Sequence, residues 1–255
     1  MHHLVIGEGQ IGRAIIERAL ADGDTVTVLR RTAKDPSPGI RRVAGDVLDP
    51  AALGAAIDGA GAVHATFHAP YDARLWREQL PPRELAVLDA AAGRGIPVVF
   101  PESFYGYQGG AAHLAEDASP SPQDEKGRVR VELLAVRRAH RARTLSVIAS
   151  DLIGPSTVGT GAAVATAMVI EPLLTGRRAI LFGRADAPHT LTHVPDLAAA
   201  MLHGICGLWY GPCAQVPGRL KREEGLVTTS WEDAVGATVR AAQGARDTKA
   251  VSVAP

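Results

Sequence analysis

The sequence predicts a doubly wound α/β fold, in which helices cover both faces of a parallel sheet. Short apolar runs of strand length alternate with helical stretches six times between residues 3 and 149. Such alternation is typical of parallel sheets, because each crossover between parallel strands needs a long connection. The first run also ends in a glycine-rich turn that opens a helix. A chain of 255 residues that is 46% hydrophobic can bury a large core.

The glycine-rich turn is the segment around which the rest of the fold is arranged. It reads Gly7-Glu8-Gly9-Gln10-Ile11-Gly12 and joins a strand at residues 3–6 to an amphipathic helix. The first glycine allows a sharp turn, the second lets a pyrophosphate approach the backbone, and the third lets helix and strand pack closely. The N–H groups where the helix begins, at Gln10 and Ile11, are expected to face the phosphates. The turn predicts a dinucleotide site, and a purely structural turn is the alternative.

The end of the second predicted strand indicates which dinucleotide is bound. Residues 25–29 form this strand, and Arg30 and Arg31 follow it. NAD-binding folds place an acidic residue here to hold the ribose 2′-hydroxyl. A guanidinium can instead grip a 2′-phosphate and stack on adenine. We therefore expect NADP as the preferred cofactor, with NAD possible. In the alternative, both arginines are solvated and the pocket accepts either cofactor.

Two further strand ends supply expected cofactor contacts. The third strand, residues 40–44, ends in Gly45-Asp46-Val47. Asp46 is placed to accept a hydrogen bond from the adenine amino group, and Val47 lies beside it. The fourth strand, residues 61–67, carries small residues where the cofactor backbone would pass, among them Thr66. For Asp46 the alternative is an ordinary turn aspartate.

The remaining elements follow the same alternation up to residue 155 and become less regular after it. In the first part we expect helices at 50–58, 80–94 and 124–141, and strands at 96–100 and 144–149. After it we expect a helix at 161–174, an extended piece at 179–182, a strand at 190–194, a helix at 195–204 and a helix capped by Ser230. The chain is therefore divided into a dinucleotide-binding domain, residues 1–155, and a small C-terminal substrate-binding region, residues 156–255.

The fifth strand leads into the best candidate for chemistry. Pro101 begins a predicted loop that carries Ser103, Tyr105 and Tyr107. Ligands of doubly wound sheets bind outside the carboxyl ends of the strands. A serine and two tyrosines at such an end are therefore candidates for contact with substrate. In the alternative, the tyrosines only line the loop.

Together these landmarks resemble the extended, or atypical, short-chain dehydrogenase/reductase superfamily, in its NAD-dependent epimerase/dehydratase branch. The resemblance covers about residues 3–200. It rests on the ordered motifs of the glycine turn, Gly45-Asp46-Val47, Ser103 to Tyr107, Asp151 with Gly154-Pro155, and Thr192-His193-Val194-Pro195-Asp196. It implies a Rossmann fold and an NAD(P) cofactor. It also implies oxidoreductase or epimerase activity on a small carbonyl or hydroxyl compound or a nucleotide sugar.

The catalytic half of the resemblance is incomplete. The family uses a Tyr-x-x-x-Lys pair, in which the tyrosine is the acid/base and the lysine lowers its pKa and holds the ribose. Lys126 fits the lysine, but Pro122 stands where the tyrosine would be. Ser103 matches the family's serine or threonine, and Tyr107 takes the place of its Tyr-Gly signature. The Arg and Tyr of the family's Arg-x-x-Asn-x-Tyr-Gly-Pro segment are missing from residues 148–155.

Two functional hypotheses follow. In the first, the chain is an NADP-dependent oxidoreductase or epimerase-like enzyme. Tyr105 then supplies the proton, Ser103 polarises the substrate oxygen and Lys126 holds the nicotinamide ribose. Tyr105 is chosen by elimination, as one of only four tyrosines, and Tyr71 is the reserve candidate. In the second, the chain is a non-catalytic NADP(H) sensor or regulatory protein. Loss of the phenol at position 122 favours the sensor, whereas Ser103 and Lys126 argue for the enzyme.

The amino-acid composition excludes several classes of binding partner. Lys plus Arg and Asp plus Glu are 27 each, so no net field attracts nucleic acid or an anionic membrane. No apolar run approaches the roughly 18 to 20 residues that span a bilayer, and we expect no signal peptide. Cys206 and Cys213 lack companion ligands at zinc spacing, so we expect no metal and a cytoplasmic location. His64 and His68 are expected to pack or lie in loops, and the chain to be a monomer or homodimer.

Overall fold

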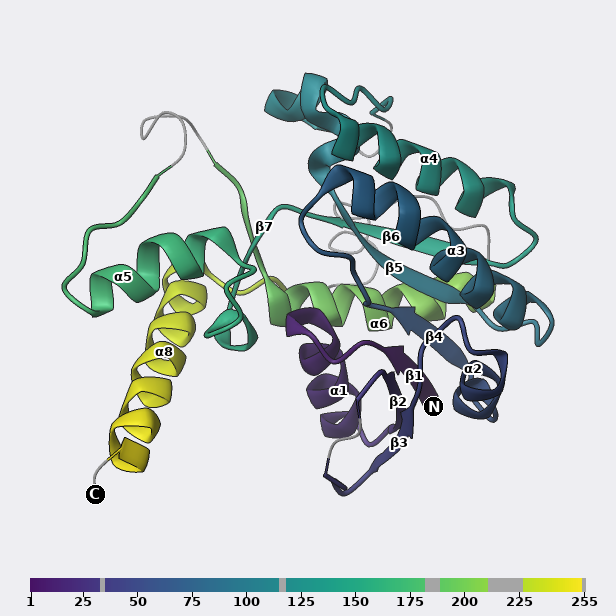
Figure 1. Cartoon of the computed structure of the whole chain (residues 1–255), viewed down its shortest axis with the longest axis horizontal. Helices are drawn as coiled ribbons and strands as arrows, with labels where there is room; N and C mark the ends of the chain where they lie inside the picture. The colour runs from purple at the N-terminus through teal and green to yellow at the C-terminus, as the bar shows by residue number, and fades with distance from the viewer. Residues whose placement is uncertain (33–34, 115–117, 182–188, 211–226, 254–255) are drawn as a thin grey trace. The chain divides into compact units, whose positions relative to one another are not determined.

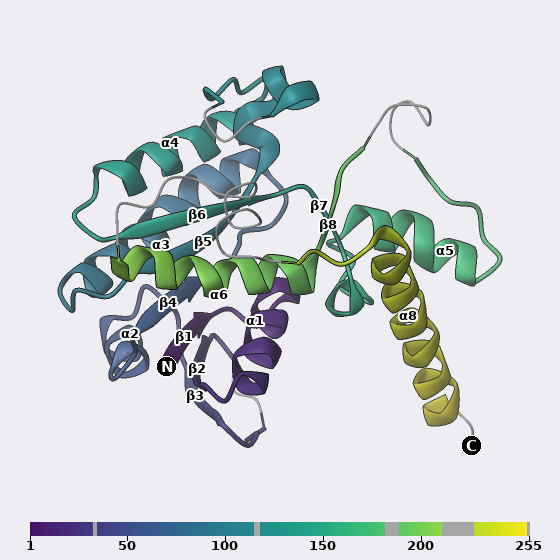
Figure 2. The same cartoon turned by 180° about the vertical axis from the view of Figure 1, so that it is seen from behind.

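The computed structural model describes the chain apart from residues 33–34, 115–117, 182–188, 211–226 and 254–255 (Figure 1 and Figure 2). The chain forms two compact units. The first comprises residues 1–148 and 198–226, and the second comprises residues 149–197 and 227–255. The glycine turn and the segment around Ser103 both belong to the first unit.

The first unit is built on a six-stranded sheet in the order β3-β2-β1-β4-β5-β6. Its strands are β1 (His2–Ile6), β2 (Thr25–Arg30), β3 (Ile40–Ala44), β4 (Ala62–Ala65), β5 (Val98–Ser103) and β6 (Thr144–Ala149). The ladders from β3 through to β5 are all parallel. The strand order reverses between β1 and β4, which is the switch point where doubly wound sheets bind ligands. The predicted fold class is confirmed.

Helices cover both faces of this sheet. The crossovers carry α1 (Gln10–Ala21), α2 (Pro50–Ile57), α3 (Ala73–Ala92) and α4 (Glu125–Ala139). Helix α3 packs against both α2 and α4, and α3 and α4 lie over one face of β5 and β6 (Figure 1). From residue 198 onward, α6 (Val194–Tyr210) lies on the other face (Figure 2). There Gly204 approaches β6 so closely that a Cβ atom would collide with the Leu145 side chain.

Aspartates fix where three of these helices begin. Each accepts a hydrogen bond from a backbone N–H of the first turn, which would otherwise have no partner. The pairs are Asp49 with Ala51 at 2.9 Å, Asp72 with Leu75 at 2.9 Å and Asp124 with Gly127 at 2.7 Å. The α1 N-cap is Gly9, which has no side chain to offer.

Two apolar clusters stabilise the first unit. The larger fills the space between the sheet and the helices α2 and α3, with Val87 and Leu88 of α3 among its buried members. The smaller joins Trp76 and Leu80 of α3 to Val129 and Leu133 of α4, and Tyr105 packs against it. Helix α3 therefore contributes its N-terminal half to one cluster and its C-terminal half to the other.

Helix α3 differs from the sequence prediction at its start. It begins at Ala73 rather than at residue 80, and Pro81 and Pro82 lie in its interior. A proline inside a helix removes a hydrogen bond and usually ends or kinks it, which is why the pattern predicted a later start. The Asp72 cap and the burial of Trp76 stabilise the turns before the prolines.

The segment after β5 also differs. The strand continues through Pro101 to Ser103, where a loop was predicted, because Glu102 is buried and ion-paired beneath it. The next residues form η1 (Phe104–His113), a 3-10 helix interrupted at Tyr107, whose φ and ψ are −126° and 18°. The chain therefore reaches the candidate residues as a strand end followed by a compact turn.

The second unit contains a small parallel sheet of β7 (Asp151–Ile153) and β8 (Leu191–His193). Its described helices are η2 (Pro155–Thr157), η3 (Thr166–Ile170), α5 (Glu171–Leu174) and α8 (Trp231–Val253). Helix α8 packs against η2 and α5. The hydroxyl of Ser230 accepts a hydrogen bond from the Asp233 N–H at 3.1 Å, which confirms the predicted cap.

Two helix boundaries in this part of the chain were predicted wrongly. The helix expected from residue 161 begins at residue 164 and is of π type in η3. Residues 179–181 belong to no helix or strand and residue 182 lies outside the described residues, so the expected extended piece stays a prediction. Helix α6 continues to Tyr210 instead of ending at residue 204. Helix α8, far along the chain, packs against α5, and such a contact leaves no local pattern in the sequence.

Candidate cofactor and catalytic site

Two glycines of the turn between β1 and α1 have no room for a side chain. Gly7 has a φ of +97°, which glycine adopts at little cost, and its N–H donates to the Leu29 carbonyl of β2 at 3.0 Å. A Cβ atom on Gly12 would collide with the Gly7 carbonyl oxygen and lie 2.9 Å from the Thr66 hydroxyl. Gly7 therefore makes the turn, and Gly12 lets α1 approach it.

Gly9 is different, because the space beside it is open. No heavy atom lies within 4 Å of the position of a Cβ atom there. As N-cap it offers no side-chain hydrogen bond to the first turn of α1, which begins at Gln10 and Ile11. The side-chain oxygen of Gln10 is buried without a hydrogen-bond partner. An open backbone at an uncapped helix N-terminus fits the pyrophosphate of a dinucleotide.

Thr66 lies behind this turn, after β4. Its hydroxyl donates a shared hydrogen bond to the carbonyl oxygens of Ile6 at 3.1 Å and Gly7 at 2.8 Å. The single hydroxyl proton is therefore used to hold the turn against β4. A contact between Thr66 and the cofactor stays a prediction.

Arg30 ends β2 and shares a carboxylate with a second arginine. Its Nη1 lies 3.4 Å from Oε2 of Glu8, and Nη1 of Arg42 on β3 lies 2.9 Å from the same oxygen. The Glu8 side chain is only 7% exposed, whereas Arg31 is exposed. Sequence reasoning missed Glu8 and Arg42. The available signal was a carboxylate between the glycines of a turn that should receive phosphates.

Asp46 and Val47 follow β3, next to the end of β2, since Ala44 pairs with Arg30. Oδ1 of Asp46 accepts a hydrogen bond from the Leu48 N–H at 2.9 Å, so the side chain has the turn role that was its alternative interpretation. Val47 is buried in the larger cluster, and only its backbone can face a ligand. Their contacts with the cofactor stay predictions.

The structure brings Tyr105, Tyr71 and Lys126 together. The hydroxyls of Tyr105 and Tyr71 are 2.6 Å apart. Nζ of Lys126 lies 4.3 Å from the centre of the Tyr71 ring, within cation–π range. The Tyr105 ring stands edge-on to Trp76, with the ring centres 5.6 Å apart. Tyr71, the reserve candidate, thus contacts both the primary phenol and the lysine.

Gly127 explains how η1 approaches the start of α4. A Cβ atom there would collide with the Tyr105 carbonyl oxygen and lie 2.9 Å from Cβ of Pro122. Tyr105 therefore lies beside the chain segment in which the family carries its tyrosine, although Pro122 itself has no phenol. Tyr107 is buried, with 2% exposure, and packs in the interior.

Ser103 ends β5 beside a buried carboxylate. Its N–H donates to Oε1 of Glu102 at 2.8 Å, and its hydroxyl makes a long contact of 3.4 Å with the same oxygen. The backbone bond fixes the strand end, whereas the long contact leaves the hydroxyl able to reorient. Ser103 is half-buried, so it is accessible to a small ligand.

A buried ion network anchors this strand end to the helices. Arg137 of α4 contacts Glu84 of α3 at 2.5 Å and Oε2 of Glu102 at 2.8 Å, and all three side chains are at most 4% exposed. Burial by itself would lower the pKa of Arg137, but Glu102 and Glu84 outweigh it and raise the pKa above its usual value. The network was missed because Glu84 and Arg137 lie in helices with many charged residues, where a buried charge has the same sequence pattern as a solvated one.

His68 continues this network beyond the end of β4. Its Nε2 accepts a hydrogen bond from Arg130, and its Nδ1 donates to the Ala69 carbonyl at 2.7 Å. Nε of Arg130 in turn lies 3.4 Å from Glu102. Burial, aided by the charge of Arg130, lowers the pKa of His68. Both ring nitrogens are thus used in a neutral histidine that supports the loop.

The glycine turn thus lies at the switch point of the sheet, and polar side chains lie at the end of a neighbouring strand, β5. Residues 7–144 match the family model described as NAD(P)H-binding. The chain belongs to the NAD(P)H-binding family. No curated protein matches it significantly.

Solved structures with the same fold as this NAD(P)H-binding protein include three bacterial proteins. The enzyme WbmH of Bordetella bronchiseptica in complex with NAD+ shares 17% identity with a TM-score of 0.76, over 95% of this chain and 98% of that one. UDP-N-acetylglucosamine 4-epimerase of Bacillus cereus shares 12% with a TM-score of 0.78, over 96% of each chain. UDP-glucose 4-epimerase of Thermotoga maritima with UDP-glucose shares 14% with a TM-score of 0.72, over 96% and 100%. The resemblance to the epimerase/dehydratase branch is confirmed at the level of the fold.

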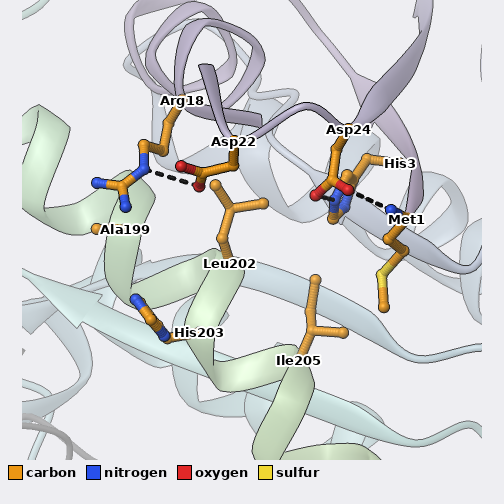
Figure 3. A pocket seen from close by; sticks show the side chains of 9 residues that line it. All are labelled: Met1, His3, Arg18, Asp22, Asp24, Ala199, Leu202, His203 and Ile205. Atoms are coloured by element: carbon orange, nitrogen blue, oxygen red, sulfur yellow. Dashed lines mark hydrogen bonds and ion pairs between the residues drawn. The ribbon is translucent and has the colours of Figure 1, made fainter. Parts of the chain in front are cut away.

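A cavity of about 200 Å³ in this NAD(P)H-binding protein lies away from the candidate residues (Figure 3). It is lined by the end of α1, the amino ends of β1 and β2, and α6. The lining residues are Met1, His3, Arg18, Asp22, Asp24, Ala199, Leu202, His203 and Ile205. His3 bridges Asp24 at 3.0 Å and the buried His64 at 3.1 Å. Burial, together with His3, lowers the pKa of His64 to about 3. His64 is therefore a neutral packing residue.

Among the residues that the structure describes, no helix has the length and apolarity to cross a bilayer. The same residues contain no cluster of His, Cys, Asp and Glu that could hold a metal ion. Cys213 lies outside the described residues, and the side chain of Cys206 is likewise not described. The expectations for the cysteines therefore stay predictions.

Proposed function

We propose that the protein is an NADP(H)-dependent oxidoreductase or epimerase-like enzyme in which Tyr105 is the proton donor. The observation that carries the proposal is the cluster of Tyr105, Tyr71 and Lys126 beside the segment where the family's phenol is missing. A phenol and a lysine ammonium are the two groups that the family's acid/base pair requires. The cluster therefore offers the same chemistry from different positions in the chain.

The glycine turn, Gln10 and the start of α1 would hold the pyrophosphate, and Arg30 would contact the 2′-phosphate of NADP(H). When bound, the nicotinamide supplies or accepts the hydride. The Tyr105 hydroxyl donates its proton to the substrate oxygen and recovers one through Tyr71, whose side chain is 68% exposed. The Ser103 hydroxyl turns from Glu102 to polarise the same oxygen, and Lys126 holds the nicotinamide ribose.

For the substrate, we propose a small carbonyl or hydroxyl compound, with nucleotide sugars as the first class to test. Support comes from the fold, which is shared with UDP-glucose and UDP-N-acetylglucosamine 4-epimerases. We further propose that residues 156–255 form the substrate-binding region and that the protein acts as a monomer or homodimer.

The test combines cofactor binding with turnover. Calorimetry with NADPH and NADP+ measures binding. Absorbance of NADPH with aldehydes and ketones, and product analysis with UDP-sugars, measure turnover. The Gly9→Val variant is the negative control, since a side chain there would occupy the open space at the turn. Turnover that disappears in the control supports the enzyme, and failure to bind either dinucleotide contradicts it.

A second candidate is a non-catalytic NADP(H) sensor. The observation that favours it is Pro122 at the position of the family's tyrosine. Tight cofactor binding without turnover of any carbonyl compound or UDP-sugar would support the sensor over the enzyme. A sensor should also change its protease sensitivity or oligomeric state when NADPH is added, and both can be measured on the same protein.

A further inference from the structure

The glycine turn brings a carboxylate to the end of β2. The N–H of Gly7 is bonded to Leu29, the penultimate residue of β2, at 3.0 Å. The side chain of the next turn residue, Glu8, contacts Arg30, the last residue of that strand. NAD-binding folds place an acidic residue at this strand end to hold the ribose 2′-hydroxyl. Here the carboxylate reaches the same place from the neighbouring turn.

Two arginines converge on this carboxylate from one face of the sheet. Arg42 pairs with Val28 in the ladder, and Val28 and Arg30 point to the same face because they are two residues apart. Arg42 forms a forked pair with Glu8, at 2.9 Å and 3.4 Å. Its Nε is buried without a hydrogen-bond partner, so one donor is still available to a ligand. Two cations and one anion leave a net positive charge.

We infer that Glu8 is a residue that discriminates between the two cofactors. Its carboxylate accepts hydrogen bonds from the ribose hydroxyls of NAD(H), and it competes with the 2′-phosphate of NADP(H) for Arg30 and Arg42. The inference rests on the proposed function only in requiring a dinucleotide in the glycine turn. It adds a residue that limits the NADP preference expected from Arg30.

The charges explain why one side chain affects both cofactors. A 2′-phosphate gains charge-assisted hydrogen bonds from the guanidinium groups, but it meets the Glu8 carboxylate, which already uses some of their donors. An unphosphorylated ribose brings neutral hydroxyls, which can donate to that carboxylate without repulsion. The arginines then serve to orient Glu8. Removing the negative charge of Glu8 should favour the phosphorylated cofactor and disfavour the other.

The experiment compares the wild type with Glu8→Gln, which keeps the shape of the side chain and removes its charge. Calorimetry measures the affinities for NADP+ and NAD+, and for adenosine 2′,5′-bisphosphate and AMP, which report on the adenosine end alone. We expect the NADP+ to NAD+ affinity ratio to rise about 10- to 100-fold, as for a charged hydrogen bond. The control is Glu17→Gln, which removes an exposed carboxylate from α1 and should leave the ratio unchanged.

Glu8→Ala, which also removes the carboxylate, replaces Glu8→Gln in the test if the latter does not fold. A second variant tests the arginines of the same cluster. Arg42→Gln removes a phosphate donor and leaves the carboxylate, so the same ratio should fall. An unchanged ratio in both folded variants, with the wild type binding NADP+, overturns the role of Glu8 and leaves the proposed function standing. A wild type that binds neither dinucleotide contradicts the proposed function and the inference together.

Discussion

The hydroxyl of Tyr105 is hydrogen-bonded to the hydroxyl of Tyr71 at 2.6 Å. Tyr105 packs against Trp76 in the smaller apolar cluster, whereas Tyr71 is 68% exposed. The pair therefore connects a half-buried phenol to solvent through a second phenol. A proton that leaves Tyr105 can be replaced along this bond without opening the cluster.

Tyr105→Phe should retain cofactor binding and lose turnover. The ring and its contact with Trp76 stay, and only the hydroxyl is deleted. Loss of a general acid lowers kcat by roughly 10² to 10⁴-fold. Tyr71→Phe should cost less and change the shape of the pH–rate profile, because it removes the route for proton exchange. Steady-state kinetics of the two variants measures both effects, and full activity in Tyr105→Phe would remove it from the mechanism.

Gly9→Val should abolish cofactor binding while the fold survives. The added side chain meets no protein atom within 4 Å of its Cβ, but it occupies the space that a pyrophosphate needs. Gly12→Ala is the contrasting variant, because its Cβ would collide with the Gly7 carbonyl and should lower the melting temperature. Calorimetry and thermal unfolding separate the two outcomes. Wild-type affinity in Gly9→Val would place the phosphates elsewhere.

Arg30→Ala should weaken NADP(H) and leave NAD(H) nearly unchanged. The loss should be about 1 to 3 kcal/mol, as for a charge-assisted hydrogen bond. The Arg42 pair continues to hold Glu8 in this variant, so the turn itself should keep its structure. Calorimetric titration with each cofactor checks the difference, and equal losses for both would mean that Arg30 does not contact the 2′-phosphate.

Arg137→Met should destabilise the first unit strongly. It leaves the Glu84 carboxylate buried without its cation and leaves Glu102 with only the longer contact to Arg130. Breaking a buried ion pair from one side costs about 3 to 5 kcal/mol of unfolding free energy. The matched control is Arg77→Met, which breaks only exposed ion pairs on the neighbouring α3. Urea unfolding that ranks the two variants equally would contradict the anchoring role of the network.

The protein should lose stability as the pH falls below about 6.5, the pKa of an unperturbed histidine. Burial lowers the pKa of His64 to about 3 and also lowers that of His68. At a pH between the lowered pKa of the folded chain and the ordinary pKa of the unfolded chain, the unfolded chain binds protons that the folded chain does not. The free energy of unfolding is thus full above about pH 6.5 and falls below it, by up to about 1.4 kcal/mol per pH unit for His64.

Urea unfolding between about pH 7.5 and 4.5 measures this slope. In His64→Gln the slope should be flatter, because the substituted side chain does not titrate. An unchanged slope would assign the acid sensitivity to other groups.

The parallel sheet could be predicted because most of its strands are short apolar runs with a clear turn after them. Strands β3 and β6 were predicted with the boundaries that the structure has. Helix α3 was not, since the prolines at its centre outweighed the Asp72 cap in the sequence pattern. The turn itself could also be predicted, because Gly7 and Gly12 are required by the backbone. A dinucleotide at this turn stays a prediction.

The polar contacts of the site could not be predicted, since they join residues far apart in the chain. Glu8 meets Arg42, Tyr71 meets Tyr105, and Glu102 meets Arg137. Each pairing depends on how the strands are ordered, which the sequence pattern left open. A buried carboxylate also looks like a solvated one until its partner is known.

The two prolines of α3 divide that helix into two segments that can unfold independently of each other. Neither proline has an N–H to donate to the preceding turn, so the backbone ladder is interrupted where the apolar contacts also change from one cluster to the other. The turns that carry Trp76 can therefore open without the turns that carry Val87 and Leu88. Amide exchange should reveal two protection levels along this single helix. The lower level should belong to the half that supports Tyr105, because its residues pack in the smaller apolar cluster.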